Sequence, residues 1–303
     1  MVVEGARLPS HRMLRSLHRR PRGRALAPVL SRVTGGRVPA GAAEPASPGR
    51  AGPEEVWFRE HLDAADQVME FLAGGGLTLE GRAVADIGSG DGIIDLGLAL
   101  RGRPRSLVGY DVNLTSTEHL LEQARRYAGV DALPPNLSFA SSEPERLPAA
   151  DASFDVLVTW SAFEHVRDPI GLLREMRRVM RPDGVLFLQL WPFYHSPKGS
   201  HLWDWFPEPF HHLQQSTEEV EAAMRASDRH PPEWTEYMLS EFKTLNRVTV
   251  DDLQASLRDA GFSVRRLELI PHRTHVPPGL DAFPLSVLGI AGVKLLAVPA
   301  RPG

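Results

Sequence analysis

A glycine turn directly after a buried strand constrains this sequence more than any other segment. The apolar residues 83–85 lead into Asp86-Ile87-Gly88-Ser89-Gly90-Asp91-Gly92, and a helix is predicted to begin near Ile93. The three alternating glycines leave the backbone without Cβ atoms, so a ligand can lie directly against it. The pattern therefore indicates a strand, a sharp turn and a helix that together bind a nucleoside cofactor.

The spacing of the glycines bears on which nucleoside cofactor fits. Dinucleotide enzymes favour G-x-G-x-x-G, whereas this turn reads D-x-G-x-G-x-G, and Asp91 would place a negative charge beside a pyrophosphate. A second predicted strand ends on Asp111, about 20 residues after the turn, where a carboxylate can accept both ribose hydroxyls. Two alternatives stay open, since glycine turns also occur for packing alone and an acidic strand end can be a helix N-cap.

Strand and helix patterns alternate along most of the chain, and the strands are continuously apolar. This predicts an α/β fold with a doubly wound, mostly parallel, seven-stranded Rossmann-like sheet whose ligands bind at the carboxyl ends of the strands. A partly helical cap over 192–248, with helices near 216–227 and 233–245, is predicted as an insertion after the fifth strand. The predicted strands cover 82–87, 105–111, 137–141, 154–160, 184–191, 262–270 and 292–298.

Composition sets the domain organisation and excludes several classes of function. We predict one domain over 53–303 and a disordered Arg/Ala/Pro-rich tail over 1–52, because ten arginines but only two glutamates lie in the first 50 residues. The folded part is then acidic, which argues against a nucleic-acid partner. The segment nearest to a membrane span, Phe283 to Val298, is interrupted by Lys294 and reads better as a turn and a buried strand.

The absence of cysteine excludes disulfides, thiolate metal sites and cysteine nucleophiles. The arginine-rich start also resembles an organelle transit peptide, but the same Arg/Ala/Pro bias continues through the remaining chain. We therefore expect a cytoplasmic protein that makes no membrane contact. The sequence gives no indication of the oligomeric state.

Seven ordered segments resemble the class I S-adenosylmethionine-dependent methyltransferases, in their small-molecule, methyltransferase type 11-like branch. These segments are VADIGSGDG (84–92), GYD (109–111), ERLP (145–148), SFDVLV (153–158), FEHVRDP (163–169), LLREMRRVMRPDG (172–184) and AGF (260–262). The resemblance implies S-adenosylmethionine as the cofactor. The cofactor-binding residues that it implies are Asp86, Gly88, Ser89, Gly90, Gly92, Asp111, Val112, Glu143 and Trp160.

The roles of Glu143 and Trp160 among these cofactor-binding residues are less direct than those of the others. The family usually has Asp where this chain has Glu143, and that carboxylate accepts a hydrogen bond from the adenine amino group, so the longer side chain would reach it from farther back. Trp160 ends the fourth strand, where the family's loop passes beneath the sulfonium, and it can be a cofactor contact or a wall of the site.

Histidines are the candidates for proton transfer, since their ordinary pKa lies near neutrality. His165 is expected on the rim beyond the fourth strand, and His195 and His201 lie in the predicted cap. His165 can equally be part of a structural loop cap. The cap histidines and nearby acids can line a substrate pocket, hold a divalent metal or simply pack with aromatics. Their spacing matches no metal motif, so no metal site is predicted.

The sequence thus predicts transfer of a methyl group from S-adenosylmethionine to a small-molecule acceptor, with oxygen favoured over nitrogen or carbon. Two alternatives remain: a catalytically silent protein that keeps the cofactor fold as a scaffold, and a nicotinamide-dependent oxidoreductase.

Overall fold

The computed structural model describes residues 52–301. The predicted disordered tail over 1–52 therefore lies outside the described residues, apart from Gly52.

The described residues form one seven-stranded sheet in the order β3-β2-β1-β4-β5-β7-β6. Only β7 runs antiparallel to its neighbours β5 and β6, so the predicted doubly wound, mostly parallel sheet is confirmed. The strands are β1 (Ala83–Ile87), β2 (Ser106–Asp111), β3 (Leu137–Ser141), β4 (Phe154–Trp160), β5 (Met180–Leu190), β6 (Phe262–Pro271) and β7 (Ile290–Pro299).

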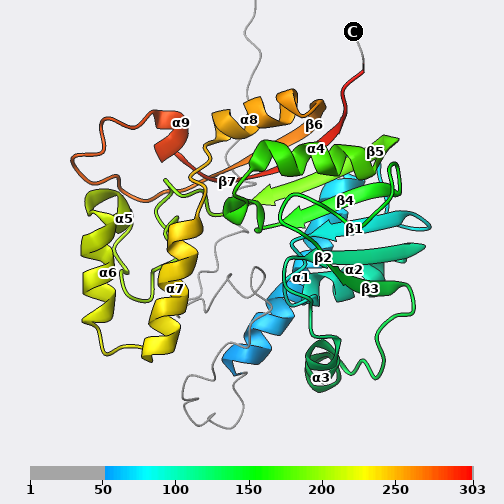
Figure 1. Ribbon diagram of the computed structural model, residues 1–303, viewed down its shortest axis with the longest axis horizontal. Helices are drawn as coiled ribbons and strands as arrows, with labels where there is room; N and C mark the ends of the chain where they lie inside the picture. The colour runs from blue at the N-terminus through cyan, green and yellow to red at the C-terminus, as the bar shows by residue number, and fades with distance from the viewer. Residues whose placement is uncertain (1–51, 302–303) are drawn as a thin grey trace, which may run out of the picture.

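Helices cover both faces of this sheet, with α4 and α8 on one side and α1, α2 and α3 on the other (Figure 1). In β1, Ala83 and Ala85 belong to the apolar core under α4 and α8, while Val84 belongs to the core under α1 and α2. Burial on both faces explains the continuous apolar strands. The helices are α1 (Pro53–Ala73), α2 (Ile93–Gly102), α3 (Thr117–Ala128), α4 (Pro169–Val179) and α8 (Val250–Asp259).

The strand boundary that differs most from the sequence prediction is the start of the fifth strand, which was predicted at 184 and lies at Met180. In the structure α4 ends at Val179 and Met180 is already extended, with φ −81° and ψ 138°. Pro182 explains the early end, because proline has no N–H for a helical hydrogen bond and favours an extended residue before it.

The position of α1 depends on a close approach to α2. A Cβ atom on Gly97 in α2 would lie 2.6 Å from the Cβ of Ala65 in α1 and 2.8 Å from the Leu62 carbonyl oxygen, so this contact requires glycine. Arg101 adds hydrogen bonds from α2 to Asp66 (2.7 Å) and to the Leu62 carbonyl (3.0 Å). These contacts fix α1 against the sheet, and its first half reaches the carboxyl ends of the strands.

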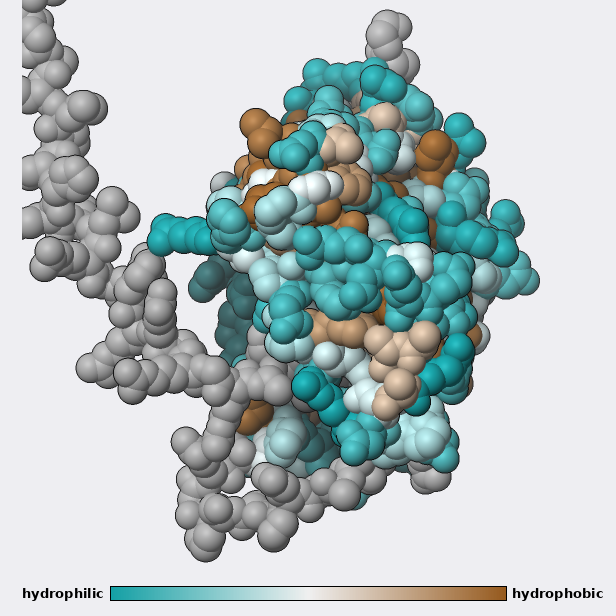
Figure 2. Space-filling view, turned by 90° about the vertical axis from the view of Figure 1, so that its left-hand side faces the viewer, coloured by the Kyte–Doolittle hydropathy of each residue, from teal (hydrophilic) through white to brown (hydrophobic). Residues whose placement is uncertain are grey.

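The segment between β5 and β6 contains α5 (His211–Gln214), α6 (Thr217–Arg225) and α7 (Pro232–Thr244), which lie to one side of the sheet (Figure 1). The two longer helices lie near the ranges that the sequence predicts, and the role of the segment as a substrate cap stays a prediction. Its outward face is largely hydrophilic in Figure 2. Its buried apolar residues form a core of their own: Tyr194, Leu202, Trp205, Val220, Met224, Met238, Leu239, Phe242 and Leu245.

Two further features complete the fold. The segment from Phe283 to Val298, expected to be a turn and a strand, forms the short helix α9 (Leu285–Leu288) followed by β7. Within residues 52–301, no helix combines the length and apolar character needed to cross a membrane.

His212 is buried within the segment between β5 and β6, and its Nε2–H donates a hydrogen bond to the Tyr194 carbonyl oxygen at 2.5 Å. Burial lowers its pKa from 6.5 to about 4, with smaller contributions in the same direction from the charges of His195, His211 and Arg247 and an opposing one from the hydrogen bond to Tyr194. Because the unfolded chain then binds more protons than the folded one, the contribution of neutral His212 to stability falls as the pH drops below 6.5.

We expect His212→Gln to weaken the acid sensitivity of the fold. The free energy of unfolding of the parent protein should fall by roughly 2 kcal/mol more between pH 7 and pH 5 than that of the variant. Urea denaturation at both pH values measures this difference. His119→Gln, at an exposed position of α3, is the control and should behave as the parent. An unchanged pH dependence in His212→Gln would contradict the assignment.

Candidate functional site

The glycine turn follows β1 and begins α2 at the carboxyl ends of the strands. Gly88, Gly90 and Gly92 all have left-handed backbone conformations, with φ of +82°, +55° and +76°. A Cβ atom on Gly88 would lie 2.4 Å from the Cβ of Ala162, which follows β4. Glycine at this position therefore lets the chain after β4 come close to the turn. Asp86 lies fully buried in β1 just before it.

Asp111, at the end of β2, holds the glycine turn in place. Its Oδ2 accepts a hydrogen bond from the Gly90 N–H at 3.0 Å, and its Oδ1 accepts one from the Asn113 N–H at 2.9 Å. The Thr115 hydroxyl donates to the Gly90 carbonyl oxygen at 2.7 Å and lies 3.3 Å from the Ser89 hydroxyl. The structure thus brings the carboxylate next to the turn, and its contact with ribose stays a prediction.

Val112 and Glu143 lie beside Asp111, at the ends of β2 and β3. The Ser142 N–H donates to the Asp111 carbonyl oxygen at 2.8 Å, and Glu143 and Arg146 exchange two backbone hydrogen bonds. Val112 is 46% exposed, although it is apolar. An exposed valine beside a buried carboxylate is suited to packing against a flat base, and the proposed adenine contact of Glu143 stays a prediction.

Helix α1 is tied to the glycine turn by a contact that sequence reasoning missed. The Trp57 indole N–H donates to Asp91 Oδ2 at 2.9 Å, while Asp91 Oδ1 accepts from the Ile93 N–H at 3.1 Å. Asp91 therefore positions α1 as well as the start of α2.

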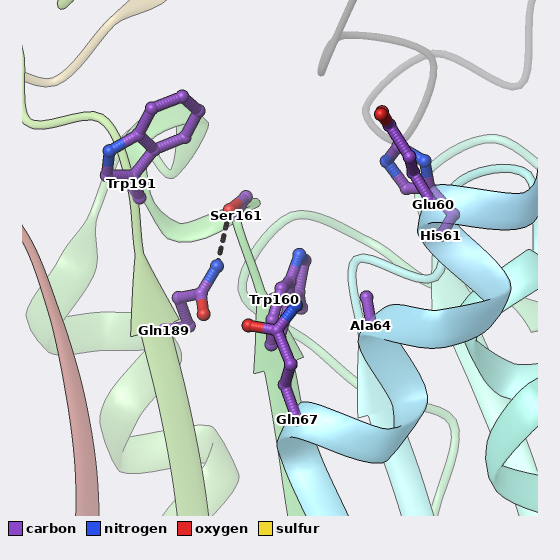
Figure 3. A pocket seen from close by; sticks show the side chains of 8 residues that line it. All are labelled: Glu60, His61, Ala64, Gln67, Trp160, Ser161, Gln189 and Trp191. Atoms are coloured by element: carbon purple, nitrogen blue, oxygen red, sulfur yellow. Dashed lines mark hydrogen bonds between the residues drawn. The ribbon is translucent and has the colours of Figure 1, made fainter. Parts of the chain in front are cut away.

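A pocket of about 160 Å³ opens between α1 and the ends of β4 and β5 (Figure 3). Trp160 is one wall and stacks on Phe187 beneath it, with ring centroids 6.2 Å apart. Ser161 has φ +46°, and its hydroxyl accepts a hydrogen bond from the Gln189 side-chain amide at 3.3 Å. The lining residues are Glu60, His61, Ala64, Gln67, Trp160, Ser161, Gln189 and Trp191.

Of these lining residues, only Trp160 was among the predicted site residues. His61 follows Trp57 by four residues, so the two side chains share one face of α1. This spacing is a sequence signal from which His61 could have been predicted as a site residue. Its Nδ1 lies 2.9 Å from the Trp57 carbonyl oxygen. Gln189 interrupts the apolar strand Leu186 to Leu190, and a buried amide in such a strand is also a signal.

His165 follows β4 as predicted, in the 3₁₀ turn η2 (Phe163–His165), and its side chain is buried there. Its side chain is 4% exposed, because His201 and Glu241 from the segment between β5 and β6 cover it. Burial lowers the pKa of His165 to about 4 and raises that of Glu241 to about 7.

The three predicted catalytic histidines fall into two groups. The rings of His165 and His201 meet edge to face with centroids 5.4 Å apart, and burial lowers the pKa of His201 well below 6.5. His195 instead contacts the rings of Tyr194 and Phe283, at 5.2 Å and 5.4 Å. None of the three lines the pocket beside Trp160, and their catalytic roles stay predictions.

The close approach at Gly88 leads to a testable prediction. We expect Gly88→Ala to displace Ala162 or the turn and to lower cofactor affinity at least about tenfold, since an added Cβ would meet Ala162 at 2.4 Å. Gly129→Ala is a matched control, because Gly129 also has a left-handed φ of +65° but nothing within 4 Å of an added Cβ. Calorimetry with S-adenosylmethionine and urea denaturation compare the two. Equal affinities would show that the contact with Ala162 has no importance for the site.

Comparison with known proteins agrees with this geometry. Residues 85–188, which contain the glycine turn, Asp111 and Trp160, match the family described as "Methyltransferase domain". The chain is 28% identical over 148 residues to a ubiquinone biosynthesis O-methyltransferase of Neisseria meningitidis, covering 43% of this chain and 60% of that protein. It is 30% identical over 103 residues to a sterol 24-C-methyltransferase of Aspergillus fumigatus, covering 33% and 27%.

Among solved structures, a putative methyltransferase from Bacillus halodurans has a TM-score of 0.48 at 15% identity, over 78% of this chain and 99% of that one. The match of residues 85–188 and the order of the seven strands lead to one conclusion. Residues 85–188 of the chain form a methyltransferase domain of the class I S-adenosylmethionine-dependent type.

Proposed function

We propose that this protein transfers a methyl group from S-adenosylmethionine to an oxygen atom of a small-molecule acceptor. One observation carries the proposal: within a methyltransferase domain, the Asp111 carboxylate contacts the glycine turn, and both lie at the same edge of the sheet as the pocket at Trp160, at the carboxyl ends of neighbouring strands. Ligands of open α/β sheets bind at this edge.

The residues at the turn are suited to the cofactor. Asp111 accepts hydrogen bonds from the backbone N–H groups of Gly90 and Asn113, which hold the carboxylate at the turn where we propose that it contacts the ribose hydroxyls. Glycines at 88, 90 and 92 leave the turn open for close approach, and Val112 offers an apolar surface beside it.

The pocket residues are suited to aligning an acceptor. S-adenosylmethionine supplies an activated methyl group, so the protein's tasks are alignment and exclusion of water. Trp160 and Trp191 offer aromatic surface, while Ser161 and Gln189 offer polar atoms from the ends of β4 and β5 (Figure 3).

An acceptor hydroxyl must also lose its proton, and we propose His61 as the group that takes it. Because a carbonyl oxygen only accepts, the contact with the Trp57 carbonyl places the His61 proton on Nδ1 and the lone pair on Nε2. Oxygen is proposed over nitrogen or carbon because imidazole suits deprotonation of a hydroxyl, and because one relative is named an O-methyltransferase.

The ribose assignment predicts that Asp111→Ala lowers affinity for S-adenosylmethionine by about 10- to 100-fold, since hydrogen bonds to a charged group are lost. Isothermal titration calorimetry measures this, with Asp183→Ala at an exposed position as the matched control. The same titration with NAD tests the oxidoreductase alternative, and tighter binding of NAD than of S-adenosylmethionine would refute the proposed function.

The proposed proton acceptor predicts that His61→Ala lowers kcat by about 10²- to 10⁴-fold with little change in cofactor affinity. The assay follows S-adenosylhomocysteine formed from S-adenosylmethionine with a panel of phenols, catechols and sugars. His119→Ala, an exposed histidine of α3, is the control. Cofactor binding without turnover on any acceptor would favour the silent scaffold instead.

A further inference from the structure

Four ionisable side chains lie buried together where η2 meets the segment between β5 and β6. Glu164 and His165 come from η2, His201 from the loop after β5, and Glu241 from α7. Each is at least nine-tenths buried. Burial of so many ionisable groups is costly unless they are paired or bind a metal.

The positions of these groups suit a shared ligand. Glu164, His165 and His201 each offer one metal-binding atom, and these three atoms lie within 4.8 Å of one another. Neither ring nitrogen of His201 has a hydrogen-bond partner among residues 52–301. A buried polar atom without a partner is uncommon in proteins. The unpartnered His201 nitrogens are therefore a second observation, independent of the clustering, that points to a ligand.

We propose that Glu164, His165 and His201 bind a divalent metal ion, with Zn²⁺ as the best match. Zinc accepts imidazole nitrogen and carboxylate oxygen together, and cysteine is not required. This differs from the sequence analysis, which predicted no metal site, because His201 lies 36 residues after His165 in the chain and the three residues form no local motif.

Glu241 acts as a positioning residue in this site. Its Oε2 lies 3.5 Å from His165 Nδ1, which leaves His165 Nε2 for the ion. Histidines that bind metals usually donate their other N–H to a carboxylate or a carbonyl oxygen, which fixes the ring orientation. Among residues 52–301, no arginine or lysine forms an ion pair with Glu241, so no such pair competes with its contact to His165.

The three ligand atoms must move closer together before they can bind a zinc ion. Zinc bonds of about 2.0–2.1 Å in a tetrahedron place ligand atoms about 3.4 Å apart. The three ligand atoms lie within 4.8 Å of one another, so side-chain rotations that bring them up to about 1.4 Å closer fill three positions around the ion.

The burial of the ligands indicates what the ion does. Three protein ligands leave the fourth position of a tetrahedral zinc ion for water. At the same junction, the Asn246 side-chain amide donates hydrogen bonds to the Phe163 and Val166 carbonyl oxygens at 2.7 and 3.0 Å. A buried metal ion here would join η2 to the segment between β5 and β6, and so help to fix that segment against the sheet.

The test uses the full-length chain, prepared with and without prior treatment with EDTA. Mass spectrometry of the metal content and calorimetry with ZnCl₂ should show one Zn²⁺ per chain, and thermal unfolding should shift to higher temperature with added Zn²⁺. His165→Ala and His201→Ala should weaken Zn²⁺ binding at least about 100-fold, and Glu241→Gln about 10-fold.

His212→Gln is the matched control, because His212 is also a buried histidine of this segment but is not in the cluster, and it should bind Zn²⁺ as the parent does. If His201→Ala does not fold, His201→Asn and the visible spectrum of the Co²⁺-loaded parent protein replace it. Tighter binding of Mn²⁺ or Fe²⁺ through the same three residues would also support the site. No micromolar binding of any divalent ion, or an equal loss in His212→Gln, would overturn it.

Discussion

The hydrogen bond from the Gly90 N–H to the Asp111 carboxylate joins the ends of β1 and β2, and the geometry of the site depends on it. It fixes the glycine turn that begins α2, and Thr115 supports the same turn from the other side of the carboxylate. Because Asp111 both holds the turn and is proposed to contact ribose, cofactor binding and the local fold share one charged group. A buried charge of this kind is stable only while its hydrogen bonds are kept.

The sheet and the glycine turn could be predicted from sequence because their signals are local. Continuous apolar runs such as Val185 to Leu188 reflect burial on both faces, and the turn at Gly88 requires a left-handed backbone conformation that glycine adopts most readily. The position of Asp111 near the glycine turn could also be predicted, because Asp111 ends a strand and neighbouring parallel strands end at the same edge of the sheet. The prediction erred by a few positions at the boundary between α4 and β5, where a single residue, Pro182, decides where the helix ends.

The pocket and the buried cluster could not be predicted, because both depend on contacts between distant segments. Gly97 allows α1 to approach α2 closely, and the spacing of Trp57 and His61 shows a shared helix face but not which part of the sheet that face meets. His165 was expected on a rim because strand order alone does not show what covers a strand end. The packing of α7 places Glu241 over it and converts an expected surface histidine into a buried one.

The short stretch after β4 connects these two regions. Ala162 fits against the glycine turn only because Gly88 has no Cβ, and His165, three residues later, lies under α7. Asn246, just after α7, binds the carbonyl oxygens of Phe163 and Val166 within the same stretch. A displacement of α7 is therefore expected to move this stretch, and with it the residue that packs on the glycine turn. The segment that we predict to cover the acceptor is thus linked to the proposed cofactor site through three residues of backbone.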